Sequence, residues 1–161
     1  MAHLILVRHA KAIDRMDADD DFERGLTPRG LEDARQAGEA VATSGIAIGL
    51  ALVSPSARTL QTFQAMSPLI GDPPRHSPMA LYHASPDFLR RAAAEALAET
   101  DCVLLVGHNP GIGTLALDLA FDAGAGHRMP DGYPTSAVTV FTVDGPGLGR
   151  AGLVAIHNPK G

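Results

Sequence analysis

Short runs of aliphatic residues alternate along the chain with longer segments in which apolar residues recur every three or four positions. Runs of consecutive aliphatic residues are typical of strands that are covered on both faces of a sheet. The longer period is typical of helices with one buried face. The predicted strands are residues 4–7, 50–53, 102–106, 137–143 and 153–156.

Helix-start signals stand between these strands. Thr27-Pro28 and Ser85-Pro86 each place a hydroxyl N-cap before a proline at the first helical position, and Gly45 is suited to close the first helix. We expect two more helices, one after residues 54–56 and one from residue 111. This alternation predicts an α/β fold, a three-layer α/β/α sandwich with a mostly parallel central sheet and an antiparallel C-terminal edge.

Length and composition limit the class of protein. With 161 residues, 45% hydrophobic and 19% charged, the chain is expected to form one globular domain over residues 1–161 rather than a disordered tail. A net charge of −5 gives no general attraction to nucleic acid or to anionic lipid. The single cysteine, Cys102, favours a reducing compartment, and the N-terminal apolar run is too short for a signal peptide or a membrane span. We therefore expect a cytoplasmic enzyme or binding domain.

Two predicted strands are each followed, after one intervening residue, by a histidine. The first strand leads into Arg8-His9, and the strand that ends at Val106 leads into Gly107-His108. Ligands of open α/β sheets bind beyond the carboxyl ends of the strands, so the two imidazoles are expected at one edge of the sheet. A single histidine there is usually structural or incidental, whereas two at equivalent strand ends favour a functional site.

Arg58 follows a third strand end, in the first turn of the next predicted helix. A cation at that position opposes the helix dipole, and an anion bound between the two removes the conflict. The alternative is that Arg58 pairs with a surface carboxylate.

A phosphoryl group fits this set of side chains. Arg8 and Arg58 can each hold phosphoryl oxygens by forked hydrogen bonds. His9 can attack phosphorus as a neutral imidazole, and His108 can donate to an equatorial oxygen of the transition state. Because side chains supply the positive charge, we expect neither a metal nor another cofactor.

Four motifs resemble those of the histidine phosphatase (phosphoglycerate mutase-like) superfamily, and they stand in its order. Leu6-Val7-Arg8-His9-Ala10 resembles the first-histidine signature, and Leu26-Thr27-Pro28-Arg29-Gly30 resembles the helix start that usually follows. Residues 54–62 resemble the second motif, in which an arginine follows a Ser-Pro turn, and residues 106–111 resemble the second-histidine motif. The short chain is most similar to the small SixA-type phosphohistidine phosphatases.

The resemblance implies that His9 is the nucleophile and becomes phosphorylated, while Arg8, Arg58 and His108 complete the phosphate pocket. Larger members use a Glu or Asp as proton donor, but residues 80–87 contain no Glu. The candidate donors are Asp87 and His83, although Asp87 also fits an ordinary charge at a helix N-terminus. A site without a dedicated acid suits an imidazole leaving group better than an alkoxide.

The sequence thus predicts a phosphohistidine protein phosphatase whose partner is a phosphorylated protein or a small phosphorylated substrate. Alternatives are a small-molecule phosphatase or phosphomutase-like enzyme of the same superfamily, and a non-catalytic phosphate-binding adaptor. A nucleotide-binding domain is a further alternative, because residues 111–116 match G-x-G-x-x-A. The acidic stretch 14–23 lacks the spacing of a calcium loop and is expected to be an exposed loop beside the site.

Overall fold

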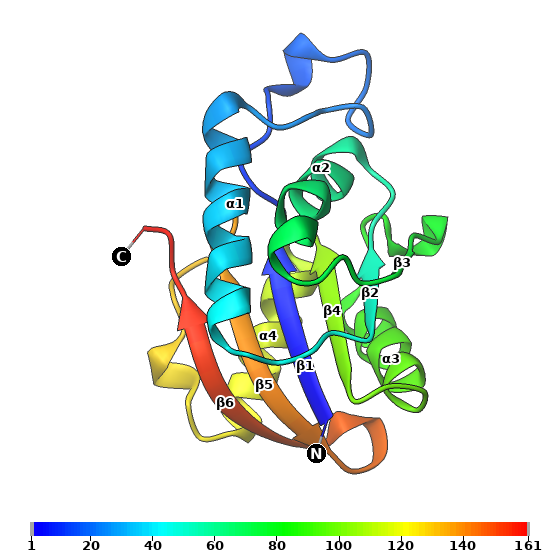
Figure 1. The fold of residues 1–161 in the computed structure, drawn as a ribbon, viewed down its shortest axis with the longest axis vertical. Coiled ribbons are helices and arrows are strands. Elements are labelled where there is room, and N and C mark those ends of the chain that lie inside the picture. The colour runs from blue at the N-terminus through cyan, green and yellow to red at the C-terminus, as the bar shows by residue number, and fades with distance from the viewer. Residues whose placement is uncertain (1, 161) are drawn as a thin grey trace.

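Strands and helices alternate in the computed structural model, which describes residues 2–160 (Figure 1). The strands are β1 (Ala2–Arg8), β2 (Leu50–Val53), β3 (Arg75–His76), β4 (Cys102–Gly107), β5 (Val138–Asp144) and β6 (Arg150–His157). The α-helices are α1 (Pro28–Thr43), α2 (Ala57–Met66), α3 (Pro86–Leu97) and α4 (Gly111–Asp122). Within the described residues, none of these helices has the length and apolar character needed to cross a membrane.

The six strands form one sheet in the order β3-β2-β4-β1-β5-β6. The pairs β1–β4, β4–β2 and β2–β3 are parallel, whereas β5 pairs antiparallel with both β1 and β6. This confirms the mostly parallel sheet with an antiparallel C-terminal edge. The two-residue strand β3 was not predicted, because two residues in a proline-rich segment are too few to show a hydrophobic period.

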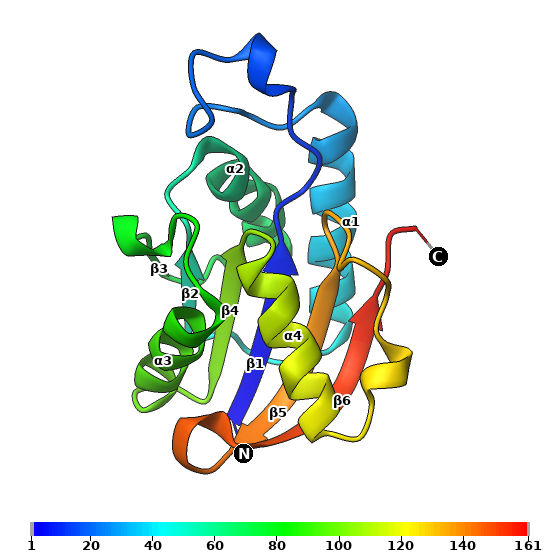
Figure 2. The same cartoon turned by 180° about the vertical axis from the view of Figure 1, so that it is seen from behind.

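Helices cover both faces of the sheet. Helices α1 and α2 lie on one face, and α3 and α4 lie on the other (Figures 1 and 2). Successive strand residues point to opposite faces, so Ile5 and Val7 pack with the α1–α2 side while Leu4 and Leu6 pack with the α3–α4 side. All four side chains are fully buried. The uninterrupted aliphatic run therefore reflects a strand that is buried on both faces.

The predicted helix starts are confirmed by hydrogen bonds. The Thr27 hydroxyl oxygen accepts from the backbone N–H of Gly30 at 3.0 Å, and the Ser85 hydroxyl oxygen accepts from Phe88 at 3.1 Å. In both helices, proline occupies the first helical position.

The sheet brings three distant strand ends together. Arg8 pairs in register with Gly107, and the backbone N–H of His9 donates to the Gly107 carbonyl at 3.1 Å. On the other side of β4, Val53 pairs with Val106, so β2 and the start of α2 lie next to the end of β4. The long segment between β1 and α1 lies at this same edge of the sheet (Figure 1).

Candidate active site

His9 follows β1 directly, and its ring is held in one tautomer. The Nδ1 atom lies 2.8 Å from the carbonyl oxygen of Ala10, which can only accept, so Nδ1 carries the proton and Nε2 keeps its lone pair. Burial lowers the pKa of His9 to about 4, against the raising effect of the Ala10 carbonyl, and the charge of Arg58 also lowers it. At neutral pH the ring is therefore uncharged and suited to nucleophilic attack through Nε2.

His108 follows β4, and its ring centroid lies 5.5 Å from that of His9. Its Nε2 atom is 2.7 Å from the hydroxyl oxygen of Ser54, while Nδ1 is buried and has no partner within residues 2–160. Burial lowers the pKa of His108 to about 3, and the charge of Arg58 acts in the same direction. The second imidazole is thus also neutral.

In each of the two predicted arginines, only part of the guanidinium group is hydrogen-bonded within the protein. Arg8 donates from Nη1 to the Tyr133 carbonyl at 3.2 Å, and Arg58 donates from Nη1 to the Asp21 carbonyl at 2.8 Å. The Nε atom of each arginine is buried without a partner among the described residues. Burial lowers the pKa of Arg8, and the nearby charge of Arg58 lowers it further. Two close cations with unused donors favour the binding of an anion.

Three buried nitrogen atoms without a hydrogen-bond partner among the described residues belong to the predicted phosphate-binding side chains. Of the four buried side-chain nitrogen atoms without a partner in residues 2–160, three are Arg8 Nε, Arg58 Nε and His108 Nδ1. The fourth, His157 Nε2, belongs to β6. A buried N–H without an acceptor is costly and uncommon in folded proteins. All three belong to side chains that the sequence predicts to hold a phosphoryl group.

Asp21 is a site residue that sequence reasoning missed. The stretch 14–23 was expected to be an exposed loop, but the Asp21 carboxylate accepts from Arg58 Nη2 at 3.1 Å and from the Tyr82 hydroxyl. Burial raises the pKa of Asp21, yet hydrogen bonds from Tyr82 and from neighbouring arginines outweigh it and hold the pKa well below its usual range. Asp21 is therefore ionised and is no proton donor in the free site.

The carboxylate that pairs with Arg58 lies inside the site and not at the surface, where the alternative interpretation places it. Arg58 does pair with a carboxylate, as the alternative interpretation allowed, but its side chain is only 4% exposed and the pair lies inside the site. The neighbouring Phe22 carbonyl accepts from the first N–H of α2, on Ala57, at 2.9 Å. The segment from β1 to α1 thus closes onto the helix start that carries Arg58. Nothing in the spacing of the five aspartates distinguishes the one that does this.

Of the two candidate proton donors, the structure brings His83 to the site. Its ring centroid lies 5.1 Å from that of His108, and its Nε2 is 3.3 Å from an Asp21 carboxylate oxygen. Asp87 is exposed in the first turn of α3, and within residues 2–160 no hydrogen bond or ion pair joins it to the site. Its position is that of an ordinary charge at a helix N-terminus, so the structure gives no support to Asp87 as a donor.

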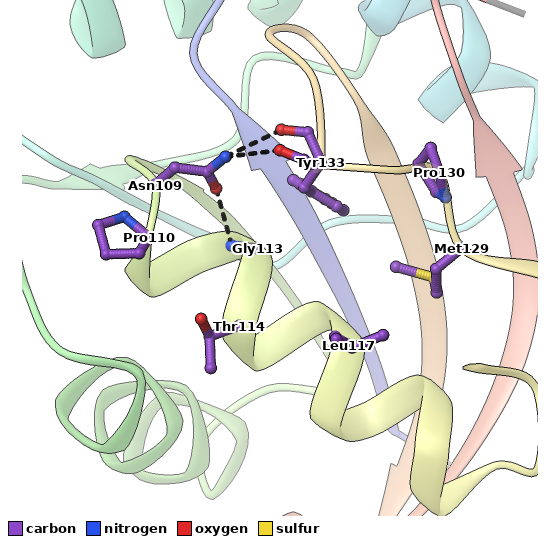
Figure 3. A pocket seen from close by; sticks show the side chains of 9 residues that line it. Asn109, Pro110, Gly113, Thr114, Leu117, Met129, Pro130 and Tyr133 are labelled. Atoms are coloured by element: carbon purple, nitrogen blue, oxygen red, sulfur yellow. Dashed lines mark hydrogen bonds between the residues drawn. The ribbon is translucent and has the colours of Figure 1, made fainter. Parts of the chain in front are cut away.

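Asn109 links the site to a neighbouring pocket of about 290 Å³, between α4 and residues 129–133 (Figure 3). Its Nδ2 donates to the carbonyls of Gly132 and Tyr133 at 2.9 and 3.0 Å, and its Oδ1 accepts from the Gly113 N–H at 3.0 Å. The Tyr133 carbonyl is also the partner of Arg8. Asn109 therefore helps to hold the acceptor that orients Arg8.

The same contacts explain the glycines of the G-x-G-x-x-A match. A Cβ on Gly113 would lie 2.6 Å from Asn109 Oδ1, and one on Gly111 would lie 2.3 Å from the Ala84 carbonyl oxygen. Both glycines permit close packing around the second histidine. Close packing therefore gives both glycines a structural role that requires no bound nucleotide.

Residues 2–160 contain no group of three His, Cys, Asp or Glu side chains close enough to hold a metal ion. The single cysteine, Cys102, is buried in β4, and burial raises the pKa of its thiol to about 11. A thiol with so high a pKa is not a nucleophile at neutral pH.

Two histidines and two arginines at the carboxyl edge of this α/β sheet form a set of side chains suited to binding a phosphoryl group. Residues 4–81 match the family model of the histidine phosphatase superfamily (branch 1). An uncharacterized protein of Mycobacterium tuberculosis is 32% identical over 162 residues, which cover 96% of this chain and 100% of that protein. The chain belongs to the histidine phosphatase superfamily (branch 1).

Solved structures show which members it resembles. A protein assigned as the phosphohistidine phosphatase SixA of Agrobacterium tumefaciens superimposes with a TM-score of 0.85 and 27% identity, over 98% of both chains. The protein histidine phosphatase SixA in complex with tungstate has the same fold, with a TM-score of 0.81 and 23% identity over 98% of this chain and 97% of that one. The fold is thus SixA-like, and the family supports phosphatase activity for this chain.

The two buried neutral rings predict an acid-dependent loss of stability. The pKa values of His9 and His108 are lowered to about 4 and about 3, whereas in the unfolded chain both lie near about 6.5. The unfolded state therefore binds more protons below pH ~6.5, and the free energy of unfolding falls as the pH drops toward ~4. Between pH 7 and pH 4.5 we expect a loss of at most about 3 kcal/mol for each ring, because pH 4.5 lies about 2 units below the unfolded-state pKa and one unit corresponds to ~1.36 kcal/mol.

Urea unfolding at pH 7 and at pH 4.5 measures this loss. The difference between the two pH values should shrink in His108→Asn, which removes one titrating ring, and should persist in His76→Asn, whose ring is exposed on β3. An equal pH dependence in the wild type and His108→Asn would show that His108 does not titrate in this way.

Proposed function

We propose that this protein is a phosphohistidine phosphatase that acts on phosphorylated proteins through a phosphorylated His9. The observation that carries the proposal is the set of three buried nitrogen atoms without a partner in residues 2–160, Arg8 Nε, Arg58 Nε and His108 Nδ1, beside a histidine whose Nε2 is unprotonated. A tetrahedral anion with an electrophilic centre satisfies both features at once, since its oxygens accept from the donors and its phosphorus accepts the lone pair.

In the first step, the Nε2 lone pair of His9 attacks phosphorus opposite the leaving nitrogen. The new bond joins Nε2 to phosphorus, and the bond from phosphorus to the substrate imidazole breaks with its electron pair moving to the leaving nitrogen. The nitrogen takes up a proton, for which His83 is the nearest candidate, because it lies beside His108 and is half-exposed to solvent. Arg8, Arg58 and His108 stabilise the charge on the equatorial oxygens.

In the second step, water attacks phosphorus along the same line. The bond to Nε2 breaks, the electron pair returns to His9, and the proton lost by water leaves with solvent or with the inorganic phosphate product. No group other than water is consumed. The hydrogen bond from Nδ1 to the Ala10 carbonyl holds the ring of His9 in the same tautomer in both steps.

The preferred substrate depends on which groups of the site can protonate the leaving group. An alkoxide leaving group requires a strong general acid, whereas an imidazole with a reference pKa of about 6.5 leaves readily once protonated. Asp21, the one carboxylate that contacts Arg58 among the described residues, is ionised. This favours phosphohistidine over sugar or serine phosphates, and the likeness to SixA structures points the same way.

The experiment compares kcat/KM for a phosphohistidine peptide, phosphoserine, a sugar phosphate and p-nitrophenyl phosphate, each with and without EDTA. We expect kcat/KM for the phosphohistidine peptide to exceed that for phosphoserine by at least about tenfold, the ratio that a difference of 1.4 kcal/mol in transition-state binding produces. EDTA should change no rate, because side chains supply the positive charge. A preference for a sugar phosphate would instead make this a small-molecule phosphatase, and loss of activity on chelation would contradict the mechanism.

A further inference from the structure

Ser54 is a buried side chain that the proposed mechanism does not yet use. It follows β2 directly and is fully buried. Its backbone N–H donates to the Val106 carbonyl at 3.2 Å, and its own carbonyl accepts from the Thr59 hydroxyl at 2.6 Å. The backbone of Ser54 is thus tied both to β4 and to the first turn of α2, which leaves its hydroxyl in a defined position.

The Ser54 hydroxyl has one hydrogen-bond partner in residues 2–160, the Nε2 atom of His108, at 2.7 Å. Because the residue is fully buried, solvent offers no other acceptor for the hydroxyl hydrogen. The hydroxyl therefore satisfies its hydrogen by donating to Nε2. The opposite arrangement, with a proton on Nε2 pointing at the oxygen, would leave a buried hydroxyl hydrogen without an acceptor.

A neutral imidazole has one ring proton, so an Nε2 that accepts requires a proton on Nδ1. Nδ1 is the atom of His108 that is buried and unpartnered, and the His108 ring lies next to the ring of His9. In this tautomer Nδ1 offers an N–H to a phosphoryl oxygen. In the other tautomer it would offer a lone pair, which repels that oxygen.

We propose that Ser54 is a positioning residue, which donates its hydroxyl hydrogen to His108 Nε2 and so keeps the ring proton on Nδ1, where it is donated to the phosphoryl group. This rests on the proposed phosphoryl-transfer function of the site. The role is parallel to that of the Ala10 carbonyl at His9. The Ala10 carbonyl accepts from His9 Nδ1 and leaves a lone pair on Nε2 of that ring. The Ser54 hydroxyl donates to His108 Nε2 and leaves a proton on Nδ1 of that ring.

The direct test is the tautomer of His108 in the ligand-free protein, measured by ¹⁵N NMR of the histidine rings at pH 7. In the wild type we expect the proton on Nδ1, and in Ser54→Ala a mixture of the two tautomers. Ser56→Ala is the matched control, because the Ser56 hydroxyl is equally buried but bonds to Thr59 and not to an imidazole. A wild-type His108 with its proton on Nε2, or an unchanged tautomer in Ser54→Ala, overturns the proposal.

The kinetic test is a double-mutant cycle with p-nitrophenyl phosphate. Ser54→Ala should lower kcat about tenfold in the wild-type background, the effect of one lost hydrogen bond to a reacting group, and less than about twofold in the His108→Ala background. Ser56→Ala should stay within about twofold of the wild type. Equal losses in both backgrounds would show that Ser54 acts through packing, and would overturn the proposal.

Ser54→Cys serves if the alanine variant does not fold, since it keeps the size of the side chain and a weak S–H donor. Its kcat is expected between those of the wild type and His108→Ala, and a kcat equal to that of the wild type contradicts the role.

The proposed function and the proposed role of Ser54 can fail independently of each other. If the wild type hydrolyses no phosphorylated substrate, the proposed function is wrong, while the tautomer measurement still decides the role of Ser54.

Discussion

His9→Ala is expected to abolish turnover, with a loss of at least about 10⁴-fold in kcat, because the variant lacks the side chain that forms the proposed covalent intermediate. The buried neutral imidazole with its free Nε2 is the nucleophile in the proposed mechanism. The arginines and His108 remain in the variant, so tungstate should still bind. Phosphate trapped on the protein by rapid acid-free quenching should be present in the wild type and absent in His9→Ala.

His76→Ala is the control, since this histidine lies exposed on the edge strand β3. It should turn over at the rate of the wild type. A His9→Ala variant that keeps more than about one hundredth of the wild-type kcat would exclude a covalent intermediate on His9, because the loss of a nucleophile costs far more than that.

Arg58→Ala is expected to lower kcat/KM by about 10²–10³, the range found when one donor to a developing oxyanion is removed. Arg58 also positions Asp21, because its Nη1 donates to the Asp21 backbone carbonyl and its Nη2 donates to the Asp21 carboxylate. Arg58→Lys should therefore remain at least about tenfold impaired, since an ammonium group lacks the planar fork that serves both partners. Steady-state kinetics with a phosphohistidine peptide measures both variants.

Arg90→Ala is the matched control for Arg58. Arg90 also donates to backbone carbonyls, those of Gly147 and Leu148, but it belongs to α3 and forms no hydrogen bond or ion pair with a site residue within residues 2–160. Its removal should leave kcat/KM unchanged. An Arg58→Ala variant with a near wild-type rate would place Arg58 outside the phosphate pocket.

Much of the fold followed from the sequence because its signals are local. The aliphatic run at residues 4–7 predicted a strand buried on both faces, and the Thr27 and Ser85 caps predicted two helix starts. Strand direction then placed His9 and His108 at the same edge of the sheet, and the register between Arg8 and Gly107 agrees with that placement. The catalytic roles of these residues stay predictions until the variants are measured.

Other parts of the site had no signal in the sequence. Asp21 lies 37 residues from Arg58 and 61 from Tyr82, and it looked like any other residue of an acidic loop. Ser54 is separated from His108 by 54 residues, and its hydroxyl was indistinguishable from that of Ser56. Such contacts depend on the path of a loop or on a single side-chain direction, neither of which has a sequence period.

The sequence by itself determined the order of strands and helices along the chain, apart from the two-residue strand β3, and the strand ends that carry imidazole and guanidinium groups. Hydrophobic period, capping and chain direction are properties of neighbouring residues. The tertiary structure alone decided that Nδ1 of His9 carries the ring proton, that both rings are neutral, and that Asp21 pairs with Arg58. Proton positions and pKa values depend on burial and on charges that meet through space, and those exist only once the chain has folded.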